Sequence, residues 1–236
     1  MYGIIGLFIG IFLQLITLNN SLKIISLQPG GLNGFYLFGI SKYIKENYDL
    51  EDTLYFGSSA GAWNAVYLSN KNPVFSKKFQ KYLENLDISN MNNLYDIECS
   101  IKKFYSQHSH TNDFNLKQIH ICVSQIKKFG LRKKIYSNFN SIEDAINCCM
   151  ASSHIPFVTD DNLFFTYKNK LCVDGGFFEY PHPSKIYPNI ILHPHMWKNP
   201  HIRNFGNFKT FNVSQHIQWG YQDACSHKKE LDVALF

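Results

Sequence analysis

Residues 54–68 read LYFGSSAGAWNAVYL, and this stretch decides the fold. The apolar residues before Gly57 suit a buried strand, and the alanines and apolar residues after Gly61 suit a packed helix. Between them, residues 57–61 fit the G-x-S-x-G pattern, in which the glycines permit a sharp turn that exposes the central hydroxyl group. The stretch predicts a strand–turn–helix unit with Ser59 as a candidate nucleophile. An ordinary strand-to-helix connection built from small residues gives the same pattern.

The composition is that of one folded domain without the charge pattern of a nucleic-acid-binding protein. The chain has 236 residues, of which 45% are hydrophobic and 17% charged, and this is enough apolar material for a substantial core. The formal net charge is +5, and the basic residues occur as short, scattered groups. We therefore expect no nucleic-acid partner. A mildly basic surface does suit an anionic membrane face.

The N-terminal segment, residues 1–20, is expected to lie outside the folded domain of residues 21–236. Residues 3–18 contain no charged side chain, and as a helix they would be about 24 Å long, compared with about 30 Å for a hydrocarbon core. The segment lacks the basic start and the small-residue cleavage site of a typical signal peptide. We predict a signal anchor and hence membrane association. A cleaved signal peptide, with a secreted or lumenal domain, is the alternative.

A second strand–turn–helix unit precedes the first. Residues 22–28, LKIISLQ, have the β-branched and apolar character of a central strand, and residues 35–48 carry apolar side chains at helical spacing. The turn between them is rich in glycine and spans residues 29–34, PGGLNG. Two such units side by side place both turns at the carboxyl edge of one sheet, where α/β proteins keep their sites.

The rest of the chain predicts further helices and strands around these two units. Apolar periodicity and turn residues divide the sequence, and residues 127–132 supply the turn of a predicted hairpin. The predicted helices span residues 73–88, 93–105, 141–151 and 214–231, and the predicted strands span residues 116–125, 133–139, 163–167, 170–173 and 189–192. The fold class is therefore α/β, with a mostly parallel central sheet.

Three turns carry residues suited to ester hydrolysis. Besides the elbow around Ser59, they are the glycine-rich turn of residues 30–34 and the late turn Asp174-Gly175-Gly176, which follows a predicted strand. A serine nucleophile needs a base that takes the hydroxyl proton and N–H donors that stabilise the oxyanion. The three turns together can supply all three parts.

In this order, the three turns resemble those of the patatin-like phospholipase family, which has a glycine-rich oxyanion loop, a G-x-S-x-G elbow and a late D-G-G/A motif. Residues 142–157, IEDAINCCMASSHIPF, resemble the family's helix and Ala-Ser-x-x-Ile-Pro segment, most closely in the branch that contains adipose triglyceride lipase. Residues 220–224, GYQDA, resemble the start of the domain's last helix. The resemblance covers residues 22–227 and implies a three-layer α/β/α sandwich.

The resemblance implies a lipid acyl hydrolase that works through a Ser-Asp dyad without a cofactor or a metal ion. Ser59 would be the nucleophile and Asp174 the proton acceptor. Aspartate has an ordinary pKa of about 3.9, so its use as a base implies a desolvated site. The family pattern assigns the remaining positions as follows: Gly30, Gly31 and Gly34 to the oxyanion hole, and Gly57, Ala60, Gly61, Gly175 and Gly176 to the elbow and the base turn.

Two residues depart from the family pattern, and the substrate is left open. Pro29 replaces the glycine that opens the loop and has no N–H to donate, and Asn33 replaces an Arg or Lys of many members. Phospholipids and acylglycerols present the same ester to Ser59. The expected partner is a lipid substrate at a membrane or lipid-droplet surface.

Two rival functions fit parts of the same sequence. An α/β-hydrolase would use Ser59 and Asp174 with a histidine, and the candidates that follow in chain order are His182, His193, His195 and His201. A catalytically inactive, membrane-anchored domain that binds lipid or a partner is the second rival. The cysteines and histidines show no zinc-site spacing, so no metal ion is predicted.

Overall fold

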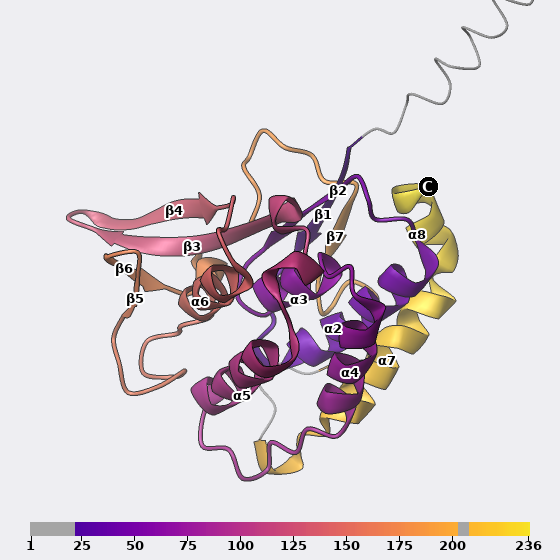
Figure 1. Cartoon of the computed structure of the whole chain (residues 1–236), viewed down its shortest axis with the longest axis horizontal. Coiled ribbons are helices and arrows are strands. Elements are labelled where there is room, and N and C mark those ends of the chain that lie inside the picture. The colour runs from indigo at the N-terminus through magenta and orange to yellow at the C-terminus, as the bar shows by residue number, and fades with distance from the viewer. Residues whose placement is uncertain (1–21, 203–207) are drawn as a thin grey trace, which may run out of the picture.

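A computed structural model describes residues 22–202 and 208–236. The predicted N-terminal hydrophobic segment lies outside the described residues. Within the described residues, no helix has both the length and the apolar character needed to cross a membrane. Figure 1 shows a mixed α/β fold in which one sheet packs against a group of helices.

One sheet of seven strands has the order β5-β6-β3-β2-β1-β7, and β4 pairs with β3 outside this path. Four neighbouring strands run parallel: β1 (Lys23–Leu27), β2 (Thr53–Gly57), β3 (Ile119–Lys127) and β7 (Ile190–Leu192), which forms one edge. The remaining strands pair antiparallel at one side: β4 (Gly130–Tyr136), β5 (Phe165–Tyr167) and β6 (Lys170–Val173). The predicted α/β class with a largely parallel central sheet is confirmed.

The helices begin largely where polar residues can cap them. Asn72 accepts hydrogen bonds from the first N–H groups of α4, and Ser141 accepts one from Asp144 at the start of α6, as predicted. The helices are α2 (Gly34–Asn47), α3 (Ala60–Leu68), α4 (Pro73–Glu84), α5 (Leu94–His108), α6 (Ile142–Ser152), α7 (Val213–Ser226) and α8 (Lys228–Leu235). Single 3₁₀ turns occur at Gly31–Asn33, Thr111–Asp113, Leu116–Gln118, Gly175–Phe177 and Phe208–Thr210.

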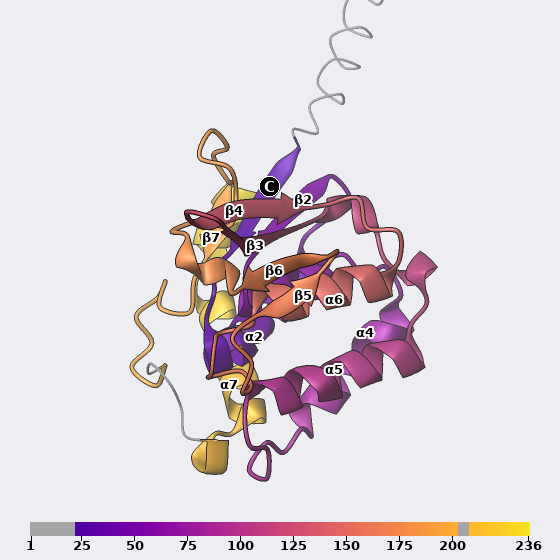
Figure 2. The same cartoon turned by 90° about the vertical axis from the view of Figure 1, so that its left-hand side faces the viewer.

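Apolar side chains of β1, β2 and β3 project from the face of the sheet that the helices cover. Ile25 pairs with Tyr55, and Tyr55 pairs with Ile119, so these three side chains share a face. All three belong to the two apolar clusters that also contain residues of α2, α3 and α6. Figure 2 shows these helices gathered on that side of the sheet. The described residues do not show a second helical layer on the opposite face, where Ser26 contacts His182 of a loop.

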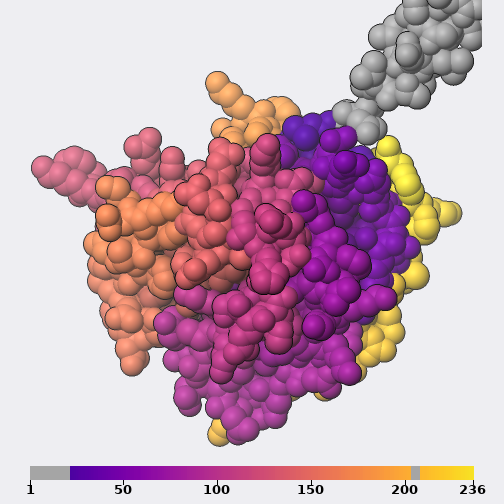
Figure 3. All heavy atoms as spheres, in the orientation of Figure 1, coloured from indigo at the N-terminus to yellow at the C-terminus, as the bar shows by residue number. Residues whose placement is uncertain are grey.

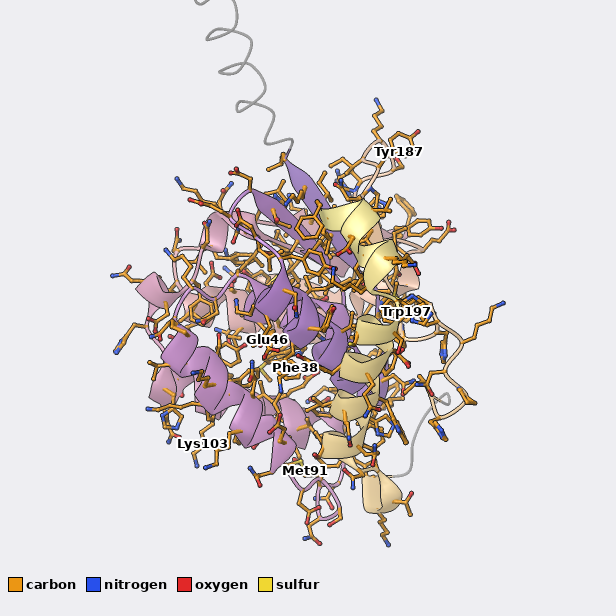
Figure 4. The ribbon with its side chains drawn as sticks, turned by 90° about the vertical axis from the view of Figure 1, so that its right-hand side faces the viewer. Phe38, Glu46, Met91, Lys103, Tyr187 and Trp197 are labelled. Carbon is orange, nitrogen blue, oxygen red and sulfur yellow. The ribbon has the colours of Figure 1, made fainter. Side chains whose placement is uncertain are left out.

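The C-terminal helices pack against α2 and close the helical layer. Tyr36 of α2 donates a hydrogen bond to Asp223 of α7 at 2.7 Å. Trp197, in the loop after β7, lies beside α8 and donates to Glu230 at 3.0 Å (Figure 4). The predicted single helix over residues 214–231 is wrong in one respect, because the chain breaks at His227 and forms two helices.

The boundaries of the hairpin also differ from the prediction. Residues 116–118 form a 3₁₀ turn rather than the start of a strand, and β3 extends to Lys127. The predicted turn over residues 127–132 is mostly strand, because only Lys128 and Phe129 separate β3 from β4. Gly130 follows with a positive φ of 118°, and such a glycine lets a short turn close the hairpin.

Candidate active site

The elbow between β2 and α3 holds Ser59 in a strained conformation. Ser59 has φ 52° and ψ −129°, a positive-φ geometry that residues other than glycine rarely adopt. A Cβ atom on Gly61 would lie 2.1 Å from the Leu27 carbonyl oxygen, and one on Gly57 would lie 2.5 Å from the Gly61 carbonyl oxygen. The sharp strand–turn–helix predicted from the sequence is therefore present, and its glycines permit backbone contacts that no larger residue allows.

Ser152 fixes the backbone of the elbow. The Ser59 N–H donates to Ser152 Oγ at 2.8 Å, and the Ser152 hydroxyl donates to the Cys122 carbonyl oxygen at 2.6 Å. This bridge joins α3, α6 and β3 directly beneath the nucleophile. Ser152 lies in the predicted helical segment before Asp174, where its position at the end of a helix is the only sequence signal of this role, and it was not predicted as a site residue.

Asp174 is held at the end of β6 by contacts on both sides. Its N–H donates to the His154 carbonyl oxygen at 2.7 Å, and its carbonyl oxygen accepts from Ser124 Oγ at 2.7 Å. Its side-chain Oδ1 accepts from the Gly176 N–H at 2.5 Å. The turn predicted around Asp174 therefore orients the carboxyl group and leaves its second oxygen for another partner.

The surroundings of Asp174 make it a stronger base than an ordinary aspartate. Burial raises the pKa of Asp174 to about 6, while the neighbouring Ser59 hydroxyl and the Gly176 N–H offset part of the rise. Oδ2 is buried and has no hydrogen-bond partner among the described residues. The Ser59 hydroxyl thus lies near this carboxyl group without a completed hydrogen bond to Oδ2, an arrangement that is common in catalytic pairs before substrate binds.

The glycine-rich loop lies beside the elbow, and two of its three predicted donors remain available. Within the described part of the chain, no hydrogen bond from the Gly30 or Gly31 N–H is found. The Gly34 N–H donates back to the carbonyl oxygens of Gly31 and Leu32, so the structure does not support Gly34 as an oxyanion donor. Gly34 is instead required for packing, since a Cβ atom there would lie 2.6 Å from Ala60 Cβ.

Two cavities of different character meet at Ser59. One has a volume of about 90 Å³, is almost entirely apolar and extends between α2, α3 and α5. The other has a volume of about 410 Å³ and is lined by Asp174, His193 and His195 together with the glycine-rich loop. Ser59 and Ile155 belong to both linings. An ester carbonyl bound at Ser59 would therefore have an apolar space on one side and a more polar groove on the other.

The histidines of the rival triad are not joined to Asp174. His182 Nδ1 lies 2.9 Å from Ser26 Oγ, and the His201 ring stacks on Trp219 with centroids 4.7 Å apart. His193 lines the polar groove, where its Nδ1 accepts from the backbone N–H of His195 at 3.0 Å. Because Oδ2 of Asp174 has no partner among the described residues and Oδ1 accepts from Gly176, Asp174 forms no Asp-His pair of the kind that a triad requires in the described part of the chain.

The other predicted site residues occupy the same region. Ala60 begins α3 directly after the nucleophile and lines the apolar cavity. Gly175 packs against β3, since a Cβ atom on it would lie 2.1 Å from the Cys122 carbonyl oxygen. Among the described residues, no group of three or more His, Cys, Asp or Glu side chains is arranged to hold a metal ion. The chain matches no protein-family model, and no curated protein matches it.

Proposed function

We propose that the protein is a serine lipid acyl hydrolase of the patatin-like phospholipase type. The observation that carries the proposal is the pair formed by a strained Ser59 and a buried Asp174 whose Oδ2 is unpartnered, at the junction of two cavities. The patatin-like three-layer sandwich and the membrane association of the N-terminal segment belong to the same proposal. Both rest on the sequence resemblance.

In the proposed reaction, Ser59 Oγ attacks the ester carbonyl while Asp174 Oδ2 accepts the hydroxyl proton. The Gly30 and Gly31 N–H groups, with that of Ala60, stabilise the oxyanion of the tetrahedral intermediate. When the C–O bond breaks, protonated Asp174 returns its proton to the leaving alcohol, and an acyl-Ser59 ester remains. Water then attacks this ester with Asp174 again as the base, which releases the fatty acid and restores the serine.

The two cavities support a lipid ester as the substrate. The first few carbons of an acyl chain suit the apolar cavity, whose lining includes Phe38 on the inner side of α2 (Figure 4). The alcohol part of the ester suits the polar groove beside Asp174. This division is compatible with both phospholipids and acylglycerols. In the proposed orientation, the acyl chain points toward α5.

Fluorophosphonate labelling tests the proposal, because this reagent reacts with activated serines. We expect the wild-type protein to be labelled, Ser59→Ala to remain unlabelled, and Asp174→Asn to react more than about a hundredfold more slowly. Circular dichroism checks that each variant is folded. A folded wild-type protein that is not labelled would contradict the hydrolase proposal and favour a binding domain.

The triad rival is tested in the same assay with His193→Ala and His195→Ala. These two side chains are the histidines that line the groove with Asp174. In a Ser-Asp dyad, each variant keeps its labelling rate within a few fold. A loss of more than about a hundredfold in either variant would identify a catalytic histidine.

A further inference from the structure

Glu98 places a buried carboxyl group in an otherwise apolar cavity. It lies on α5 with 7% of its surface exposed, and it lines the cavity of about 90 Å³ that opens at Ser59. Among the described residues of this lining, it is the one ionisable side chain. Its neighbours are mostly large and apolar, among them Phe35, Phe79, Leu83, Ile97 and Ile101.

One oxygen of this carboxyl group lacks a partner. Oε2 of Glu98 is buried and makes no hydrogen bond with any described residue. The neighbouring Ser153 hydroxyl donates instead to the Cys149 carbonyl oxygen at 2.8 Å, and it accepts from Trp63 Nε1 at 3.2 Å. A buried polar atom without a protein partner costs stability, whereas an apolar side chain of similar size would fill the same space without this cost. The unpartnered oxygen therefore indicates that a polar group of a ligand binds here.

The charge state of Glu98 indicates which groups can bind to it. Burial raises the pKa of Glu98 to about 8; Ser153 lowers it somewhat, and the Asp174 charge adds to the rise. The group is therefore mostly a neutral carboxylic acid at pH 7, which can donate one hydrogen bond and accept others. Such a group pairs with a hydroxyl without bringing a net charge into an apolar cavity.

We propose that Glu98 binds a hydroxyl group on the acyl chain, so that the preferred substrates are esters of hydroxylated acyl chains. The inference rests on the proposed hydrolase function, in which the acyl chain occupies this cavity. A plain alkyl chain would cover Oε2 and leave it unpaired, and sites built to bind a polar group reject analogues that lack it. Because Ser59 and Glu98 line the same cavity of only about 90 Å³, the hydroxyl group lies near the ester end of the chain.

A series of methyl esters with one chain length tests this preference. Each ester carries one hydroxyl group, at successive carbons, and the reference ester carries none. The released acid is measured by chromatography for the wild type, Glu98→Gln and Glu98→Leu. Glu51→Leu, at an exposed position outside both cavities, is the matched control for the change from acid to leucine.

We expect the wild type to hydrolyse at least one hydroxy ester with a kcat/KM about tenfold or more above that of the plain ester. Glu98→Gln keeps this preference, since an amide also donates and accepts, and Glu51→Leu does not change it. Glu98→Leu loses the preference and gains activity on the plain ester. The inference is overturned if the wild type has a higher kcat/KM on the plain ester than on every hydroxy ester. It is also overturned if Glu98→Leu changes kcat/KM on the hydroxy and plain esters by the same factor.

A binding measurement separates this inference from the hydrolase proposal. A free hydroxy fatty acid should raise the Tm of the wild type and of Glu98→Gln by more than the plain fatty acid does, and the two acids should act equally on Glu98→Leu. If no ester is hydrolysed but this difference in Tm is present, the hydrolase proposal fails and the hydroxyl site stands. If esters are hydrolysed but the acids shift Tm equally in every variant, only the hydroxyl site fails.

Discussion

Asp174 is buried beside Ser59, and its pKa of about 6 sets the pH at which it can accept a proton. Only the ionised carboxylate acts as a base, so kcat/KM on a soluble ester should fall about tenfold per pH unit below this value and level off above it. A rate profile from about pH 4.5 to pH 8.5 measures the midpoint. A profile that stays flat down to about pH 4.5 would show that the base has an ordinary pKa.

A histidine base would give a midpoint in a similar range, so the profile needs a control. His193 lines the same groove, and burial lowers its pKa below the usual value. The profile of His193→Gln should keep the wild-type midpoint if Asp174 is the base. Loss of the pH-dependent phase in this variant would assign the titration to the histidine.

The raised pKa of Asp174 also makes the stability of the protein depend on pH. A carboxyl group whose pKa rises on folding, from about 3.9 to about 6, binds more protons in the folded state than in the unfolded state across this window. The free energy of unfolding therefore falls as pH rises through the window, by about 3 kcal/mol. Asp174→Asn lacks this titration, so its stability relative to the wild type should increase from pH 4 to pH 7. Urea unfolding at both values measures the change, and equal differences at the two would contradict it.

The elbow is an element whose packing tolerates little change. A Cβ atom on Gly61 would lie 2.1 Å from the backbone oxygen of Leu27, which cannot move without shifting β1. We therefore expect Gly61→Ala to destabilise the protein by more than about 3 kcal/mol or to prevent folding, beyond the usual range for overpacking. Gly31→Ala is the matched control, because a Cβ atom there meets no atom within 4 Å.

Gly31→Ala should cost only the backbone strain of its positive φ, which is about 1 kcal/mol. Thermal unfolding of the two variants measures the difference. Similar losses for both would show that conformational strain, and not close backbone contact, determines the requirement for glycine.

The types of the elements were predictable from sequence where apolar periodicity is strong. Around Ser59 and around Gly31, apolar strands run into apolar helices, and both units form as predicted. The hairpin was less predictable, because its strands carry lysines on an exposed surface that needs no alternation of apolar residues. No proline or glycine marks the break at His227, so the apolar periodicity alone predicts one continuous helix.

Only the site residues that lie in sequence motifs were predictable. Ser59 and Asp174 lie in turns with recognisable glycines, and the parallel strands β1 and β2 bring the glycine loop and the elbow to one edge. Glu98 was not predictable, because in the sequence it is one polar residue of an amphipathic helix. Its burial depends on how α5 packs against α4 and α6, which is tertiary information.

At the scale of the whole molecule, the β3–β4 hairpin projects from the body (Figures 1 and 3). Phe129 at its tip has 92% of its surface exposed. No acidic residue occurs between Asp113 and Glu143, and the hairpin carries the basic residues Lys127, Lys128, Arg132, Lys133 and Lys134. An aromatic tip with flanking cations suits an anionic lipid surface.

The hairpin also contacts the segment that follows Asp174. Lys133 Nζ donates to the carbonyl oxygens of Tyr180 and His182, both at 2.5 Å. The segment that Lys133 holds follows Asp174 directly, and Phe177 at its start is 57% exposed and lines the polar groove. A lipid surface that meets the hairpin is therefore expected close to the mouth of the site.

We predict that Lys127→Gln together with Lys128→Gln weakens binding of the full chain to vesicles containing phosphatidylserine by about 25-fold, at about 1 kcal/mol for each cation. Phe129→Ala should weaken it further, because the ring no longer enters the interface. Flotation with phosphatidylserine vesicles and with neutral phosphatidylcholine vesicles measures both. The comparison removes any contribution of the apolar N-terminal segment, which would act on the two compositions alike.

Matched substitutions elsewhere decide whether position or net charge is responsible. Lys77→Gln with Lys78→Gln removes the same charge from exposed positions on α4, and Tyr187→Ala removes an aromatic ring that is 89% exposed and points into solvent (Figure 4). If the hairpin is the docking element, both controls should leave vesicle binding within about threefold of the wild type, since exposed charges more than about 10 Å from the lipid are screened. Equal losses for the two lysine pairs would instead show that net charge alone attracts the protein, with no defined docking element.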